Sequence, residues 1–108
     1  MSEDSTNQLL LAMKQAATQT SSLLKTLGNP DRLLLLCQLT QGEACVSDLE
    51  TSLGIQQPTL SQQLTVLRHE GLVTTRREGK RIYYAIADEK LFTLLNTLYQ
   101  LYCPVQEK

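Results

Sequence analysis

Three cysteines are the residues of this sequence best suited to covalent or metal chemistry. Cys37, Cys45 and Cys103 are spread through a chain of 108 residues that has a single histidine, His69. The acidic, polar amino terminus does not resemble a signal peptide, and no apolar run approaches the roughly 20 residues that cross a bilayer. We therefore expect a cytoplasmic protein, in which thiols stay reduced. Each cysteine is then an inert buried thiol, a metal ligand or a redox group, and not part of a disulfide framework.

A second group of residues suits recognition rather than reaction. The stretch QQPTLSQQL, residues 56–64, carries four glutamines, a serine and a threonine around two leucines four positions apart. Further along, residues 68–81 hold five basic residues against two acidic ones, a balance of +3, whereas residues 1–50 hold three against six, a balance of −3. A local basic patch on a chain of net charge −1 can direct that face to phosphate. A solvated charged hairpin would have the same composition.

The elements that position these residues follow from apolar spacing and from the turn residues. We expect a flexible tail over residues 1–8 and one domain over 9–104. Asn29 and Pro30 are typical of a helix start, and the apolar run after them predicts a central, buried helix. The expected elements are helices over residues 9–27, 30–40, 46–53 and 58–71, strands over 72–77 and 81–86, and a last helix that Asp88 caps and Pro104 stops.

The order of these elements predicts a winged helix-turn-helix: mainly α with a β-hairpin, in the order α-α-α-α-β-β-α. The polar helix would enter the major groove, where Gln, Ser and Thr can donate to and accept from base edges. The basic hairpin would lie beside it as a wing that contacts phosphate. The residues expected to contact double-stranded operator DNA are Gln56, Gln57, Thr59, Ser61, Gln62, Arg68, Arg76, Arg77, Lys80 and Arg81. The alternative is a winged-helix adaptor that binds a protein partner through its last helix.

No enzyme signature competes with this interpretation. The sequence has no glycine loop that would cradle phosphate, no metalloprotease motif, and no histidine placed to serve a nucleophile. We expect a DNA-binding regulator without catalytic activity and without a cofactor.

Two segments, LGNPDRLLLL and LSQQLTVLRHEGLVTTRREGKRIYYAI, resemble the ArsR family of dimeric bacterial winged-helix repressors. The resemblance covers about residues 20–103 and is most specific in QPTLSQQLTVLRHEGLV. It implies a homodimer whose first and last helices pack across the two-fold axis, and which binds operator DNA until a metal, a metalloid or an oxidant acts on a sensor site. It also allows an activator that displaces another DNA-bound protein. The apolar stripes at 9–27 and 91–102 independently favour a dimer, because one small core needs less apolar surface.

The metal sensors of the family do not match this sequence. They often carry histidines and acids on the last helix, whereas no Asp, Glu or His follows the Asp88–Glu89 cap up to Cys103, and a zinc or nickel site needs about four ligands. His69 is better explained as a surface or phosphate-facing residue. The arsenic sensors carry two cysteines one residue apart, and here Ser47 stands at the second position after Cys45. A metal- or metalloid-responsive repressor that uses Cys45 remains the alternative.

The persulfide-sensing branch of the family, the BigR- and SqrR-like repressors, matches better. Its thiol pair resembles LLCQL and LYQLYCP, which place Cys37 and Cys103 at the matching positions. From the residues alone, Cys37 among leucines would be a core thiol. The resemblance implies instead that reactive sulfur species, persulfide or polysulfide, bridge Cys37 and Cys103 and release the DNA. Cys45 departs from the branch pattern, and a thiol at a helix start can itself be reactive.

Overall fold

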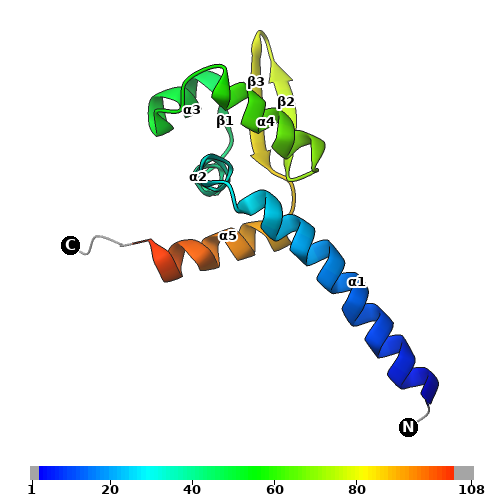
Figure 1. The fold of residues 1–108 in the computed structure, drawn as a ribbon. Helices are drawn as coiled ribbons and strands as arrows, with labels where there is room; N and C mark the ends of the chain where they lie inside the picture. The colour runs from blue at the N-terminus through cyan, green and yellow to red at the C-terminus, as the bar shows by residue number, and fades with distance from the viewer. Residues whose placement is uncertain (1–2, 104–108) are drawn as a thin grey trace.

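A computed structural model of the chain describes residues 3–103, which form five helices and a three-stranded antiparallel sheet (Figure 1). This is a winged helix-turn-helix arrangement, as the sequence predicted. In chain order the elements are α1 (Glu3–Leu27), α2 (Pro30–Leu39), β1 (Ala44–Cys45), α3 (Val46–Leu53), α4 (Thr59–His69), β2 (Val73–Glu78), β3 (Arg81–Ile86) and α5 (Glu89–Tyr102).

Helix α2 lies at the centre and contacts α1, α3, α4, α5 and β3. Its start is capped as the sequence predicted, because the Asn29 side chain accepts a hydrogen bond from the backbone N–H of Arg32 at 3.0 Å. Three leucines of α2 are fully or almost fully buried, namely Leu35, Leu36 and Leu39. The expectation that α2 is buried nearly all round is wrong on one face, where Leu34 is 44 % exposed beside an open cavity.

The helix-turn-helix unit consists of α3, a turn and α4. Helix α3 ends at Gly54, whose φ of 71° lies in the left-handed region that glycine adopts without strain. Helix α4 begins at Thr59, one residue later than expected, with Pro58 as its cap. It buries Leu60, Leu64 and Leu67, which are the three leucines that the sequence predicted, and this leaves Ser61, Gln62 and Thr65 on the outside.

The hairpin carries an additional short strand that the sequence did not predict. The strand order is β1-β3-β2, with both pairs antiparallel. Arg76 on β2 stands opposite Tyr83 on β3, and Tyr83 in turn stands opposite Cys45 on β1. We expected residues 41–45 to be a plain connection, because a strand of two residues is too short to show alternation. Strand β1 joins the wing to the segment that leaves α2.

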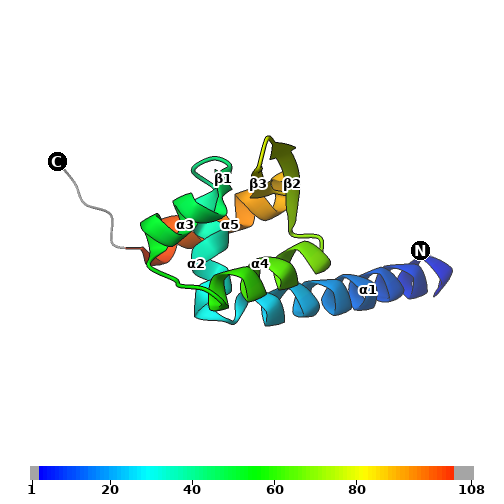
Figure 2. The ribbon, with the colours of Figure 1, turned by 90° about the horizontal axis from the view of Figure 1, so that it is seen from above.

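Helix α1 begins at Glu3, six residues before the start expected at residue 9, within the segment expected to be a flexible tail; residues 1 and 2 lie outside the described part of the chain. The tail was expected because no apolar residue precedes Leu9. A helix needs an apolar stripe only where it packs, and the side chains of residues 5–22 are all exposed. The amino-terminal part of α1 extends away from the rest of the described chain in both views (Figures 1 and 2).

Helix α5 begins as predicted, since the Asp88 carboxylate accepts a hydrogen bond from the backbone N–H of Leu91 at 2.8 Å. It ends at Tyr102, and the expected stop at Pro104 lies outside the described residues. Leu91 and Leu95 of α5 join the core, which also takes in leucines of α2, α3 and α4. Among the helices that the structure describes, none is long and apolar enough to cross a membrane.

Candidate functional site

The exposed face of α4 carries the polar residues that were predicted to read DNA. Ser61 and Gln62 on α4 are exposed, as are Gln56 and Gln57 just before the helix, whereas Thr59 is half-buried. The Gln57 side chain accepts a hydrogen bond from the backbone N–H of Ser61 at 3.0 Å, which holds the start of this face in place. The arrangement provides neutral donors and acceptors on one side of a helix, with the leucines on the other.

Gln63 belongs to the same polar stretch but has a different position. It is half-buried, and its side-chain oxygen accepts a hydrogen bond from the Arg32 guanidinium at 3.1 Å. The same guanidinium donates to the carbonyl oxygen of Thr26 at 2.8 Å. Gln63 therefore connects α4 to the junction between α1 and α2, and is not part of the exposed face.

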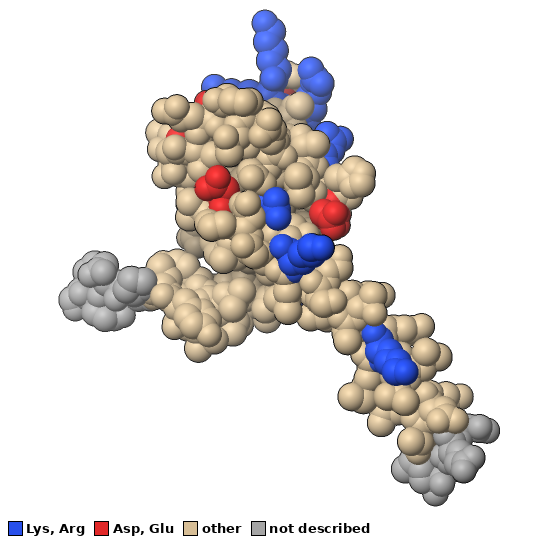
Figure 3. Space-filling model, in the orientation of Figure 1, with Lys and Arg blue, Asp and Glu red and all other residues tan. Residues whose placement is uncertain are grey.

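The wing carries exposed basic residues. Arg77, Lys80 and Arg81 are exposed at the end of the hairpin, and Arg68 is exposed near the end of α4. Lys and Arg side chains gather at the end of the molecule that the hairpin forms (Figure 3). A hydrogen bond with Tyr83 raises the pKa of Arg81. The wing and the polar face of α4 thus provide cationic and neutral hydrogen-bonding groups on neighbouring elements.

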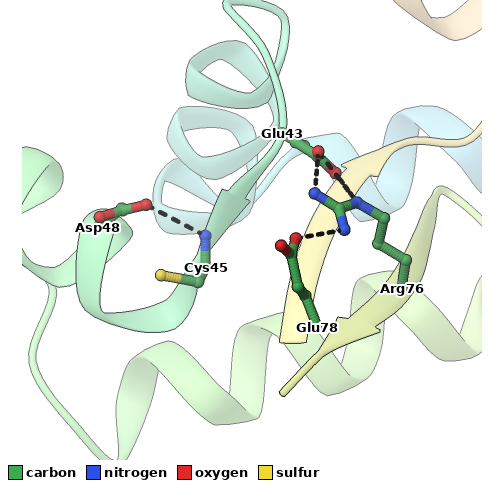
Figure 4. A network of polar contacts seen from close by, with 5 residues as sticks. All are labelled: Glu43, Cys45, Asp48, Arg76 and Glu78. Carbon is green, nitrogen blue, oxygen red and sulfur yellow. Dashed lines mark hydrogen bonds and ion pairs between the residues drawn. The ribbon is translucent and has the colours of Figure 1, made fainter. Parts of the chain in front are cut away.

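Arg76 differs from the other basic residues of the wing. Its guanidinium donates to both carboxylate oxygens of Glu43, at 2.7–3.0 Å, and to the Glu78 carboxylate at 2.8 Å (Figure 4). These hydrogen bonds raise the pKa of Arg76 and lower the pKa of Glu43. The structure therefore pairs this predicted phosphate contact with two carboxylates. Sequence reasoning missed Glu43, because nothing in residues 41–45 marks it as a partner of the wing.

Two of the three cysteines lie on one cavity. Cys37 on α2 and Cys103 at the end of α5 both line a hollow of about 710 Å³, and both are half-buried free thiols. The other lining residues are apolar, aromatic or neutral: Pro30, Leu33, Leu34, Gln38, Gln41, Leu98, Tyr99 and Tyr102. Burial, followed by the charge of the Cys103 thiolate, raises the pKa of Cys37.

Tyr99 is part of the same site and was not singled out from the sequence. It lies four residues before Cys103 on α5, so both side chains emerge on the same face of the helix. A hydrogen bond with the Cys103 sulfur raises the pKa of the Tyr99 phenol. The i, i+4 spacing of a tyrosine and a cysteine is the signal that would have identified it.

Cys45 is separate from this cavity. It is buried at the start of α3, and its sulfur lies 3.3 Å from the Ser47 hydroxyl. Among residues 3–103, no group of three or more histidines, cysteines or carboxylates is placed to hold a metal ion. His69 is exposed at the end of α4.

Large apolar side chains are exposed on the first and last helices. On α1 they include Leu9, Leu10, Leu11 and Met13, and on α5 they include Phe92, Tyr99, Leu101 and Tyr102. A small protein in water rarely leaves so many apolar side chains uncovered on two helices. These two surfaces are therefore candidates for contact with a second chain.

Comparisons with known proteins agree with this geometry. A model of the family described as bacterial regulatory protein, arsR family, matches residues 29–75. The biofilm growth-associated repressor of Agrobacterium fabrum is 52 % identical over 98 residues, which cover 91 % of this chain and 84 % of that protein. The transcriptional activator HlyU of Vibrio cholerae is 34 % identical over 98 residues, which cover 91 % of each chain.

Solved structures agree as well. The crystal structure of the transcriptional repressor BigR from Xylella fastidiosa matches with a TM-score of 0.80 and 48 % identity, and the match covers 87 % of this chain and 96 % of that one. The named relatives are transcriptional regulators rather than enzymes, which confirms the expectation that this chain is not an enzyme.

Proposed function

The chain belongs to the ArsR family of bacterial regulatory proteins, and from this premise we propose that it is a cytoplasmic transcriptional repressor with a thiol switch. It binds operator DNA as a homodimer through α4 and the wing. It releases the DNA when reactive sulfur species bridge Cys37 and Cys103. The observation that carries the proposal is that these two thiols line one cavity between α2 and α5.

The DNA-binding part rests on the exposed face of α4 and on the wing. Gln57, Ser61 and Gln62 supply groups that can hydrogen-bond to base edges in the major groove. Arg77, Lys80 and Arg81 on the hairpin, with Arg68 at the end of α4, supply positive charge for the phosphates on either side. The half-buried Thr59 is the first residue of α4 and Gln56 lies just before the helix, a position where contacts to phosphate are common.

The homodimer rests on the exposed apolar surfaces of α1 and α5. Burying them against a second copy removes apolar side chains from water, which favours association. A two-fold dimer also presents two reading helices to two half-sites about one helical turn apart.

The switch is a thiol exchange that needs no metal. A thiolate attacks the sulfane sulfur of a persulfide RSSH, takes up one sulfur as a protein persulfide and releases RSH. The second thiol then attacks the inner sulfur, closes a disulfide and expels H₂S. Two thiols and one RSSH thus give one disulfide, one RSH and one H₂S, so the protein thiols are oxidised and the sulfane sulfur is reduced to sulfide. Further donor molecules lengthen the bridge to a polysulfide.

A bridge between α2 and α5 acts on the DNA-binding elements through α2. This helix contacts α3 and α4, so a change in its position relative to α5 reaches the reading helix through packed side chains. Couplings of this kind amount to about 1–3 kcal/mol, a factor of roughly 5 to 150 in affinity.

The test is an operator-binding measurement on reduced protein and on protein treated with an organic persulfide. We expect tight, salt-dependent binding by the reduced form, weaker binding after treatment, and recovery with a strong thiol reductant. Binding that does not depend on salt would favour the protein adaptor. Release by arsenite but not by persulfide would favour the metalloid sensor that uses Cys45.

A further inference from the structure

A cluster of three charged side chains connects the wing to the segment that leaves α2. Arg76 on β2 donates to both oxygens of Glu43, which precedes β1, and to Glu78 at the end of β2 (Figure 4). The Arg76–Glu43 contact is bidentate, and this fork geometry fixes direction as well as distance. Glu43 and Arg76 are 33 positions apart, so the contact joins segments that the chain itself does not hold together.

The cluster lies across the sheet. Arg76 pairs in register with Tyr83 on the central strand, and its guanidinium carbon is 4.7 Å from the centre of the Tyr83 ring. Tyr83 pairs in turn with Cys45, two residues after Glu43. The Arg76 side chain thus extends from β2, at one edge of the sheet, over the central strand β3 to Glu43, which lies just before β1 at the other edge. This stacking restricts the Arg76 side chain further, because the ring contact and the fork must be satisfied together.

The charge of Arg76 is already balanced inside the protein. One guanidinium stands against two carboxylates, so the cluster has a net charge of −1. A basic residue strengthens DNA binding by displacing counterions from phosphate, and an arginine with two carboxylate partners must first give up those hydrogen bonds to make that exchange. Arg77 on the same strand is different: its guanidinium donates only to the carbonyl oxygen of Gly79, at 3.3 Å, among the contacts that the structure describes.

We propose that Arg76 is a positioning residue, which with Glu43 and Glu78 fixes the wing relative to the segment between α2 and β1, and does not contact DNA. This rests on the DNA-binding part of the proposed function. The tether restrains the direction of the wing. It adds to the pairing with β1, a strand of only two residues, and to the packing of β3 on α2, α3 and α5 and of β2 on α4.

The test compares four variants by operator affinity and by the slope of log affinity against log salt concentration. Glu43→Gln and Arg76→Gln each break the bidentate contact. The double variant carries both substitutions and removes the same single contact, and Arg77→Gln is the matched control. We expect each single variant to weaken binding by about three- to tenfold, and the double variant to be no weaker than either single one. The salt slopes of the two single variants and of the double variant should equal the slope of the parent. Arg77→Gln should flatten the slope by about 0.9 for each phosphate interaction that the substitution removes.

The opposite result has a distinct signature. If Arg76 contacts phosphate, Glu43→Gln frees the Arg76 guanidinium and tightens operator binding. Arg76→Gln then weakens binding and flattens the salt slope, so the two variants change the affinity in opposite directions. That outcome overturns the positioning role.

A thermal melt excludes a general loss of structure. Because the cluster is at the surface, the melting temperature of Glu43→Gln should stay close to that of the parent. A large drop would also overturn the proposal. Failure of the parent protein to bind any operator would instead refute the proposed function.

Discussion

Cys37 on α2 and Cys103 at the end of α5 line the same cavity, although 66 positions separate them in the sequence. Neither residue is informative alone, because a half-buried cysteine on a helix is common in protein interiors. Together they provide two thiols on two helices that contact each other. A covalent bridge between them would tie the centre of the domain to its last helix.

The first prediction concerns the product of the sulfur reaction. After treatment with an organic persulfide, mass spectrometry of digested protein should find the peptides that carry Cys37 and Cys103 cross-linked, directly or through one or two added sulfur atoms. Cys37→Ser and Cys103→Ser should each retain operator binding after treatment, because neither can close the bridge. Cys45→Ser is the matched control and should respond like the parent. Modification of Cys45 alone, or loss of DNA by treated Cys37→Ser protein, would contradict the assignment of the sensor.

The second prediction concerns the pH dependence of Cys37. Burial and the neighbouring Cys103 thiolate raise the pKa of Cys37, and only the thiolate is a nucleophile. The alkylation rate of Cys37, followed by mass spectrometry in Cys45→Ser protein, should therefore rise with a midpoint above that of a free thiol. Cys103→Ser should lower this midpoint only in part, since burial remains. Because the folded state holds this proton more tightly than the unfolded state, folding stability should also fall as pH rises between the two pKa values. A midpoint at or below that of free cysteine would contradict the buried position of Cys37.

The third prediction separates base reading from phosphate contact. Gln62→Ala should cost about 1–3 kcal/mol at a specific site and change which operator positions matter. Arg81→Ala should weaken all sequences alike and flatten the salt slope. Gln63→Ala is the control within the same helix, because Gln63 is half-buried against Arg32 and should not alter base preference. If Gln62→Ala and Arg81→Ala both bind a palindromic operator as the parent does, the proposed docking of α4 and the wing is wrong.

The helices were predictable where apolar spacing and a cap agreed. Asn29 with Pro30 and Asp88 marked two helix starts, Gly54 marked a stop, and the three leucines of α4 indicated its buried side; all are confirmed. These signals are local, because a cap acts within one turn and an apolar stripe repeats every three or four residues. The start of α1 was misjudged because residues 3–8 have no apolar stripe.

What could not be predicted depends on segments far apart in the chain. The sequence shows that Arg76 is basic but not that Glu43 lies beside it, since only the folding of the sheet brings them together. The open face of α2 could not be predicted for the same reason. Leu34 and Cys37 lie in an apolar run, and the cavity beside them depends on how α5 packs against α2. The convergence of Cys37 and Cys103 was implied only by the family resemblance, because no local pattern relates residues 66 positions apart.

The fourth prediction concerns Leu95. The wide apolar stripe of the last helix is compatible with a position of Leu95 in a dimer interface or in the core. The structure buries it completely in the core. Leu95→Ala should therefore lower the free energy of unfolding by about 2–5 kcal/mol, measured by denaturant titration. Leu95→Lys should abolish the folded state, which circular dichroism would detect. A folded, monomeric Leu95→Lys protein would mean instead that this residue faces a partner chain.

The last prediction concerns the dimer, which we expect to persist at low micromolar concentration. Leu9 and Met13 lie one turn apart on α1 and are 62 % and 59 % exposed, so a second copy is the simplest cover for them. Met13→Glu places a charge on this stripe, and burying an unpaired carboxylate costs more than the apolar packing of Met13 contributes. We expect this variant to sediment as a folded monomer and to lose operator binding, because one half-site alone holds the protein weakly. Ser22→Glu adds the same charge on the side of α1 opposite to Met13, about three turns beyond Leu11, and should leave the dimer intact. A parent protein that sediments as a monomer at low micromolar concentration, or equal behaviour of the two variants, would show that α1 does not form the dimer contact.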